Sequence, residues 1–176
     1  RVRASDPGPR RAAPAAARPL PIGRGQTITA PHMVASMPAR LSLSPGGRVL
    51  ETGTGGGSHA AVTAEVVGAA GVYTVEYHED LAEQARERLA ATGYGEVSVR
   101  AGDGREGWRE HAPYDRAYLT CAASTFPPAV VDQVRPGGLL LAPIGNGGQV
   151  LVRASKREDG SLKREHHGRV RFVPMQ

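Results

Sequence analysis

Residues 48–58, R-V-L-E-T-G-T-G-G-G-S, constrain the fold of this chain more than any other stretch. A short apolar run enters a loop with glycine at Gly53, Gly55 and Gly57, and an alanine-rich helix is predicted over residues 59–67. Glycine lets the backbone turn sharply and approach a ligand where a Cβ would collide. The start of the following helix directs free N–H groups and its positive end to the same point. The pattern is typical of the opening of a nucleotide-binding βαβ unit.

The next two predicted strands each end at an acidic residue. Residues 72–75 run into Glu76, which is placed as the carboxylate that bridges two ribose hydroxyls. Residues 97–101 run into Asp103 and Gly104, and an acid followed by glycine at a strand end can bond an adenine amino group and leave room for the ring. The sequence therefore predicts a nucleoside site across the tips of the first three strands.

Glu51 bears on which nucleotide is bound. The loop E-T-G-T-G-G-G is not the G-x-G-x-x-G of dinucleotide sites, and Glu51 stands two residues before its first glycine, a form typical of S-adenosylmethionine sites. A sulfonium cation favours nearby carboxylates, whereas a pyrophosphate does not. A methyltransferase is favoured over a dehydrogenase.

Composition predicts one domain behind a tail. The chain has 176 residues, 40% of them hydrophobic, which is enough for one core and too few for two domains of ordinary size. Residues 1–18 are mostly Ala, Arg and Pro and are predicted to be a disordered tail, and residues 19–176 to form the methyltransferase domain. The net charge of +5 is interpreted as a solvated tail and a charged hairpin, with a patch for acidic peptides or nucleic acid as the alternative. Aromatic residues make up only 5% of the chain, which disfavours nucleic acid because bases need stacking partners.

Cysteine usage and hydropathy indicate the compartment. Cys121 is the only cysteine, so the sequence offers neither an internal disulfide nor a cysteine-ligated metal site, and no metal is expected. No apolar run approaches the roughly 20 residues of a membrane span, and the start lacks a secretory signal. We expect a cytoplasmic protein without a membrane partner. Its first residue, Arg1, fits a fragment or a trimmed product.

The remaining pattern predicts a doubly wound, mostly parallel, Rossmann-like α/β sheet with a C-terminal antiparallel hairpin. Helices are predicted at 31–41, 79–91 and 127–134, and strands at 114–120 and 139–144. Alternating residues at 149–155 and 164–173 flank Asp159-Gly160 and predict an antiparallel pair at one sheet edge. Thr29 or a neighbour is expected to cap the first helix, with Pro31 in its first turn. Trp108 is expected to be a packing anchor, and Cys121 to be buried and unreactive.

Several longer motifs are more specific than the glycine loop. They include P-L-P-I-G-R-G-Q-T-I-T-A-P-H-M before the first strand, G-D-G-R-E-G-W, P-Y-D-R and the closing R-V-R-F-V-P. With V-L-E-T-G-T-G-G-G they resemble the protein-L-isoaspartate (D-aspartate) O-methyltransferase family over about residues 19–175. The first and last motifs are absent from generic methyltransferases. The resemblance implies the class I fold and S-adenosylmethionine-dependent carboxyl O-methylation of L-isoaspartyl (D-aspartyl) residues in damaged proteins or peptides, with repair through a methyl ester and a succinimide. We expect a monomer.

The resemblance further implies site residues. Residues 26–29 and His32 would lie over the cofactor and the isoaspartyl carboxylate, and the active-site hydroxyl of the family falls on Thr29, where members usually have serine. The expected catalytic residue is therefore Thr29. The expected cofactor-binding residues are Thr27, Ile28, His32, Glu51, Gly53, Thr54, Gly55, Glu76, Asp103 and Gly104. Structural alternatives are that Thr29 only caps a helix, that Glu51 fixes the loop and that Asp103 forms a turn.

Three departures from the family pattern leave other functions open. Thr29 adds a methyl group, Gly56 to His59 stand where members usually have serine and an aromatic residue, and an Arg/Ala/Pro tail stands where a helical segment usually precedes P-L-P-I-G. One alternative is an aspartate methyltransferase that forms aspartimide in a dedicated ribosomal peptide. Another is a catalytically impaired S-adenosylmethionine-binding protein.

Overall fold

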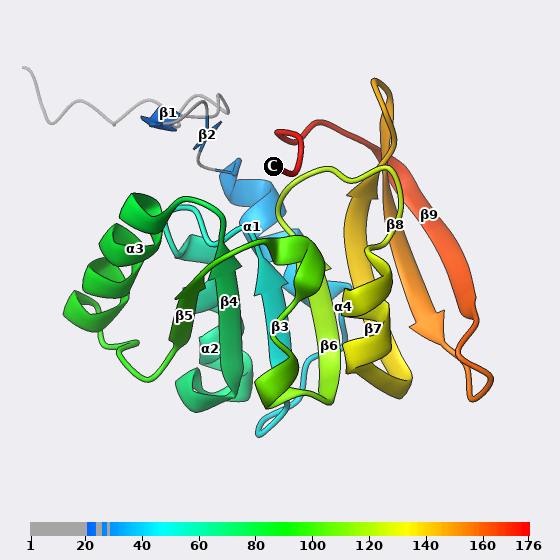
Figure 1. The fold of residues 1–176 in the computed structure, drawn as a ribbon, viewed down its shortest axis with the longest axis horizontal. Coiled ribbons are helices and arrows are strands. Elements are labelled where there is room, and N and C mark those ends of the chain that lie inside the picture. The colour runs from blue at the N-terminus through cyan, green and yellow to red at the C-terminus, as the bar shows by residue number, and fades with distance from the viewer. Residues whose placement is uncertain (1–20, 24–25, 28) are drawn as a thin grey trace, which may run out of the picture.

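The computed structural model describes residues 21–23, 26–27 and 29–176. Within these residues the main sheet has seven strands in the order β5-β4-β3-β6-β7-β8-β9 (Figure 1). Neighbours are parallel from β5 to β7, and β8 and β9 follow as an antiparallel pair at the edge. The strands are β3 (Val49–Thr52), β4 (Val72–Glu76), β5 (Ser98–Ala101), β6 (Tyr114–Leu119), β7 (Val134–Ile144), β8 (Gln149–Lys156) and β9 (Leu162–Val170). The predicted doubly wound sheet with a closing hairpin is confirmed.

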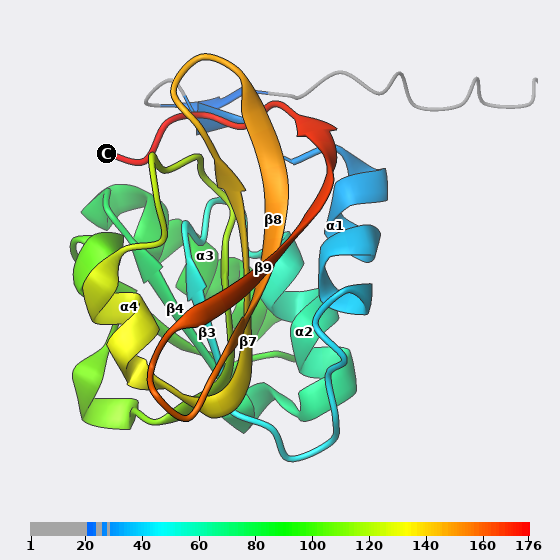
Figure 2. The ribbon, with the colours of Figure 1, turned by 90° about the vertical axis from the view of Figure 1, so that its right-hand side faces the viewer.

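Helices cover both faces of the sheet. Figure 2 shows α1 and α2 on one side and α4 on the other. Ala82 and Leu89 of α3 belong to the same buried cluster as Val67 of α2, so α3 packs on the side of α1 and α2. The helices are α1 (Pro31–Ala39), α2 (Ser58–Val67), α3 (Glu79–Ala91) and α4 (Pro128–Gln133), with short 3₁₀ turns η1 (Ala69–Gly71), η2 (Gly104–Glu106) and η3 (Arg109–His111).

Strand β3 separates two apolar cores. Val49 belongs to the core under α1, α2 and α3, and Leu50 belongs to the core under α4. All four residues of β3 are buried, because a parallel strand with helices on both faces has no solvent side. Alternation along β3 therefore directs Glu51 to the same face as Val49, toward α2.

The start of α1 differs from the sequence prediction. Ala30 is the N-cap, its carbonyl accepts the backbone N–H groups of Met33 and Val34, and no side chain of the described residues caps the helix. Pro31 lies in the first turn, as predicted. The N-cap is therefore the neighbour of Thr29, and not Thr29 itself, because the helix begins one residue too late for Thr29 to occupy the capping position.

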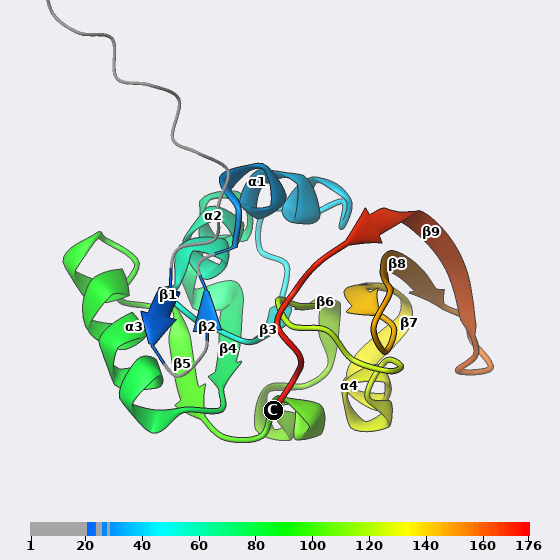
Figure 3. The same ribbon diagram turned by 90° about the horizontal axis from the view of Figure 1, so that it is seen from above.

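The end of the chain leaves the sheet earlier than predicted. β9 ends at Val170, although alternation suggested a strand to residue 173. The following residues cross to the loop after β6, where the Ala122 N–H donates to the Val173 carbonyl and the Met175 N–H donates to the Ala122 carbonyl, both at 2.8 Å. Figure 3 shows this C-terminal segment, residues 171–176, passing over the carboxyl ends of the strands.

The N-terminal part forms a small separate sheet. β1 (Pro21–Gly23) pairs with β2 (Gln26–Thr27) in antiparallel fashion, in agreement with the extended approach that the prolines predict. The predicted tail, residues 1–18, lies outside the described residues. Over the part of the chain that is described, no helix is long and apolar enough to cross a membrane.

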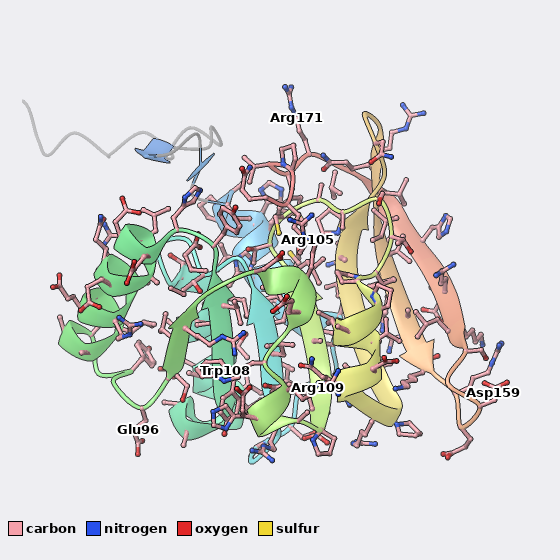
Figure 4. The ribbon with its side chains drawn as sticks, in the orientation of Figure 1. Glu96, Arg105, Trp108, Arg109, Asp159 and Arg171 are labelled. Carbon is pink, nitrogen blue, oxygen red and sulfur yellow. The ribbon has the colours of Figure 1, made fainter. Side chains whose placement is uncertain are left out.

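Trp108 packs where the sequence suggested. Its ring meets Tyr73 edge-on with centroids 6.0 Å apart and also contacts His111, while the Arg100 guanidinium lies 5.3 Å from the ring centroid. Figure 4 places Trp108 toward the amino ends of the strands, away from their tips. The expectation that Trp108 is a packing anchor is confirmed.

Substitution of Gly107 by alanine tests how α4 is joined to the loop beside it. Gly107 has φ +63° and an added Cβ would overlap the side-chain amide of Gln133, which accepts from the Trp108 N–H and donates to the Glu106 carbonyl. We expect Gly107→Ala to lower the free energy of unfolding by about 2–4 kcal/mol, since two buried hydrogen bonds are disturbed. Gly93→Ala is the matched control, because Gly93 has φ +92° and open space around it. Its cost in urea unfolding should stay near 1 kcal/mol; equal losses for the two variants would contradict the assignment.

Candidate active site

A cavity opens at the carboxyl ends of β3, β4 and β6. It includes about 750 Å³ of empty space, part of which is open to solvent. Four parts of the chain form its walls: the strand tips, the glycine loop, the first turns of α1 and α2, and the C-terminal segment. The lining residues are Thr29, Val34, Thr52, Gly53, Gly55, Gly56, Ser58, His59, Val75, Glu76, Tyr77, Gly104, Thr120, Cys121, Val173, Pro174, Met175 and Gln176.

The glycine loop needs glycine at Gly53 for two reasons. Its φ is +94°, a conformation that side chains disfavour, and an added Cβ would overlap the Thr120 hydroxyl. The Gly53 N–H donates to the Val75 carbonyl at 2.8 Å, which fixes the loop against the end of β4. The loop backbone itself therefore forms a wall of the cavity, as the sequence predicts.

Glu76 lines the cavity in a fixed orientation. One carboxylate oxygen accepts the Gly55 N–H at 2.9 Å, and the other accepts the His78 N–H at 3.2 Å. The side chain is only 5% exposed. Because each oxygen has a further lone pair, the carboxylate can still accept hydrogen bonds from a ligand hydroxyl.

Glu51 lies beneath the cavity and does not line it. The side chain is fully buried; Oε1 accepts from the Thr74 hydroxyl at 2.7 Å and Oε2 from the Tyr118 hydroxyl at 2.5 Å. Burial raises the pKa of Glu51 to about 7, although both hydrogen bonds act in the opposite direction. These contacts support the structural alternative, in which Glu51 fixes the loop, and its direct contact with a cofactor stays a prediction.

Hydroxyl groups extend the contacts of Glu51 to the walls of the cavity. Thr54 of the glycine loop bonds Thr74 at 2.6 Å, and Tyr118 bonds Thr63 of α2 at 2.9 Å. Thr54 is therefore buried beneath the cavity with Glu51, and its predicted cofactor contact also stays a prediction. We call Glu51, Thr54, Thr63, Thr74 and Tyr118 the buried network.

Asp103 and Gly104 have different roles in the structure: Asp103 forms a turn, and Gly104 lines the cavity. The Asp103 carboxylate caps η2 by accepting the Arg105 N–H at 2.9 Å, which is the turn-forming alternative, and it also pairs with the Arg105 guanidinium at 3.1 Å. Gly104 lines the cavity, and an added Cβ there would lie 3.0 Å from Cβ of Thr52. Only Gly104 of the two faces the cavity, and an adenine contact by Asp103 stays a prediction.

The predicted residues at the front of the chain are only partly placed. Thr29 lines the cavity, whereas His32 is exposed on α1 and is not part of the wall. Ile28 lies outside the described residues, and Thr27 is described only as backbone in β2. The structure thus brings Thr29, Gly53, Gly55, Glu76 and Gly104 together around one cavity.

The sequence did not identify three parts of the wall. His59, the pair Thr120 and Cys121 after β6, and residues 173–176 all line the cavity. Burial raises the pKa of the Cys121 thiol to about 12, which agrees with its expected lack of reactivity. The R-V-R-F-V-P motif was the available signal for the C-terminal wall. Arg105, which Figure 4 labels, donates to the Gln176 carbonyl at 2.7 Å and holds this segment in place.

Two buried polar atoms beside the cavity have no partner among the described residues. They are Oγ1 of Thr52 and Nε2 of His59, in side chains that are 1% and 4% exposed. Burying a polar atom without a hydrogen bond costs free energy. Unpaired atoms at a cavity wall fit a site for a polar ligand.

The comparison with known families is decisive at this point. The sequence profile of the protein-L-isoaspartate (D-aspartate) O-methyltransferase family matches residues 8–176. The chain belongs to this family.

Curated relatives agree with this assignment. "Protein-L-isoaspartate O-methyltransferase 2" of Archaeoglobus fulgidus is 50% identical over 158 residues, which are 89% of this chain and 72% of that protein. The protein-L-isoaspartate O-methyltransferase of Methanosarcina mazei is 47% identical over 158 residues, which are 89% of this chain and 65% of that protein. This chain therefore spans about two thirds to three quarters of the length of these relatives.

Solved structures support the fold. A protein-L-isoaspartate O-methyltransferase superposes with a TM-score of 0.79 at 30% identity, covering 85% of this chain and 48% of that one. A Plasmodium falciparum protein described as an enzyme of the same family, in complex with S-adenosyl-L-homocysteine, has a TM-score of 0.78 at 23% identity and covers 90% of this chain and 79% of that one. The fold is that of class I S-adenosylmethionine-dependent methyltransferases, as predicted.

Replacement of Glu51 by glutamine should change how stability depends on pH. The pKa of Glu51 is about 7 in the folded protein against 4.5 as its ordinary value, so the folded state holds a proton that the unfolded state releases between these pH values. The stabilisation that this bound proton gives the folded state is fully present below pH 4.5 and is lost as pH rises through 7. Relative to Glu51→Gln, the parent should lose ~3 kcal/mol of unfolding free energy over this interval. Urea unfolding at pH 5 and pH 8 measures it, with Glu96→Gln at an exposed position as the control. A constant difference between parent and Glu51→Gln would contradict the raised pKa.

Proposed function

We propose that this chain is an S-adenosylmethionine-dependent carboxyl O-methyltransferase acting on L-isoaspartyl (D-aspartyl) residues of proteins or peptides. One observation carries the proposal: Thr29, at the family's hydroxyl position, lines the same cavity as Gly53, Glu76 and Gly104. A methyl acceptor held at Thr29 would therefore share a space with a nucleoside held at the strand tips. Membership of the family supports the choice of acceptor.

The residues of the cavity fit S-adenosylmethionine. The Glu76 carboxylate is fixed by two backbone N–H groups and can accept from the two ribose hydroxyls. Gly104 has no side chain at the wall where the adenine ring would lie, and the unpaired Thr52 hydroxyl is a neighbour of that position. When bound, the cofactor supplies an activated methyl group on a sulfonium.

The protein has little proton chemistry to perform. The acceptor would be a carboxylate, which has an ordinary pKa near 4 and is already ionised at neutral pH. Alignment of donor and acceptor in the cavity supplies the rate enhancement, and such proximity can contribute roughly 7–11 kcal/mol in the best cases. The Thr29 hydroxyl would donate a hydrogen bond to the acceptor carboxylate and orient it. The methyl ester so formed would close to a succinimide without further help from the protein, as the backbone nitrogen attacks the ester carbonyl and methanol leaves. Water would then open the succinimide in part to normal aspartate.

Methyl transfer to a defined peptide pair tests the proposed function. With labelled S-adenosylmethionine, we expect transfer to an isoaspartyl peptide and none to its aspartyl twin, since only the isoaspartyl form is the family substrate. S-adenosylhomocysteine binding is measured in parallel by calorimetry. Transfer to neither peptide with S-adenosylhomocysteine still bound would reject the repair function and favour the dedicated-peptide or impaired alternatives.

Substitution at Thr29 tests its role in orienting the acceptor. Thr29→Ser keeps the hydroxyl and should keep turnover. Thr29→Val keeps the shape but removes the donor, so kcat should fall about tenfold or more. Affinity for S-adenosylhomocysteine should be nearly equal in the two variants, because Thr29 is assigned to the acceptor and not to the cofactor. A fully active Thr29→Val enzyme would leave Thr29 with only a structural role.

A further inference from the structure

His59 is the wall residue whose position the proposed function does not explain. It is the second residue of α2, and it lines the cavity beside Thr29, Val34 and Ser58. The side chain is 4% exposed, and its Nε2 has no hydrogen-bond partner in residues 29–176 or in the described parts of β1 and β2. A histidine kept only for packing could be replaced by an apolar residue, which would not bury an unpaired nitrogen.

The other side of the ring fixes which nitrogen carries the proton. The Met33 backbone raises the pKa of His59, which is the effect expected of a carbonyl oxygen facing a ring N–H. We assign this N–H to Nδ1, because Nε2 has no hydrogen-bond partner among the described residues. Burial lowers the pKa of His59 to about 4, so the ring is neutral at physiological pH. Nε2 is then a hydrogen-bond acceptor with a lone pair, and a pKa this low makes it a poor general base.

The arrangement of the cavity indicates which donor meets this lone pair. Gly104 and Glu76 lie at the tips of β5 and β4, so the base and ribose of a nucleoside would occupy that side. His59 lies in the first turn of α2, directly after the glycine loop that follows β3, and β3 is the next strand in the order β5-β4-β3. A nucleoside held at Glu76 and Gly104 would therefore extend its amino-acid arm across β3 toward His59.

The amino-acid arm carries an ammonium group and a carboxylate, and this wall can bind both. Its ammonium group has three N–H donors and no acceptor, which matches the Nε2 lone pair. Its carboxylate suits the first N–H groups of α2, where the helix has its positive end and its N-cap, Gly57, provides no side chain.

We propose that Nε2 of His59 accepts a hydrogen bond from the ammonium group of the amino-acid arm of the bound cofactor. This assignment rests on the proposed function, since it requires S-adenosylmethionine in the cavity. His59 is then a cofactor-binding residue that recognises the arm, whereas Glu76 recognises the ribose.

Calorimetry with three ligands tests the assignment. The ligands are S-adenosylhomocysteine, its analogue with hydrogen in place of the amino group, and 5′-methylthioadenosine, which lacks the whole arm beyond a methyl group. We expect His59→Leu to lower the affinity for S-adenosylhomocysteine about tenfold or more, because a hydrogen bond from a charged donor is lost. Binding of the two ligands without an ammonium should change by less than about twofold. His59→Gln, whose Oε1 can replace Nε2 as the acceptor, should restore most of the affinity.

Glu76→Ala is the matched control. Glu76→Ala should lower the affinity for all three ligands, because each contains the ribose. The assignment would be overturned if His59→Leu left the affinity for S-adenosylhomocysteine unchanged. It would also be overturned if His59→Leu lowered the affinity for all three ligands equally. If His59→Leu changed only the KM for an isoaspartyl peptide, the assignment would also be overturned, and Nε2 of His59 would be assigned to a hydrogen bond with the peptide.

A spectroscopic readout does not depend on whether His59→Leu folds. In protein with ¹⁵N-labelled histidine, Nε2 of His59 should be unprotonated in the free protein, and its resonance should move with S-adenosylhomocysteine but not with the deaminated analogue. His59→Gln assigns the signal. A protonated Nε2 in the free protein would contradict the proposal. Failure of the parent to bind S-adenosylhomocysteine would reject the proposed function as well, whereas absence of methyl transfer with binding intact would reject only the proposed function.

Discussion

The buried carboxyl group of Glu51 is the constraint on which the site depends. Glu51 is a residue of β3 whose side chain has no access to water, and its two oxygens accept hydrogen bonds from hydroxyls on β4 and β6. A buried carboxyl is costly unless it is fully hydrogen-bonded, so its position determines the positions of Thr74 and Tyr118. Through Thr54 and Thr63 the same network reaches the glycine loop and α2. The loop that forms the cavity wall is therefore anchored from below by hydroxyl groups.

Above this network the cavity is formed mainly by backbone and by small side chains. Gly53 and Gly104 leave space at the tips of β3 and β5, and Glu76 is held between two backbone N–H groups. The strand ends and helix starts among these walls have little freedom to rearrange, because they belong to the sheet and to the helices packed on it. A preformed site suits a reaction in which the protein contributes alignment and does not transfer a proton.

The sequence predicted the sheet, the glycine loop and the approximate position of Glu76, because hydrophobic periodicity and glycine spacing are local signals. It did not determine which way the acidic side chains point. Alternation along β3 directs Glu51 toward α2, and the Asp103 carboxylate is used by the turn that follows it. Thr29 was expected to cap α1, but the helix begins at Pro31 after Ala30. His59 and residues 173–176 enter the wall through contacts between segments that are far apart in sequence, and such contacts leave no periodic pattern.

The C-terminal segment has a consequence for biosynthesis. Residues 173–176 are the last part of the cavity wall to be translated, and they hydrogen-bond to Ala122 and Arg105. The sheet up to β7 can form earlier, while the ribosome is still adding the hairpin. The cavity of a nascent chain is therefore open on one side, and a small molecule that needs all four walls can stabilise the chain only once residues 173–176 have been added.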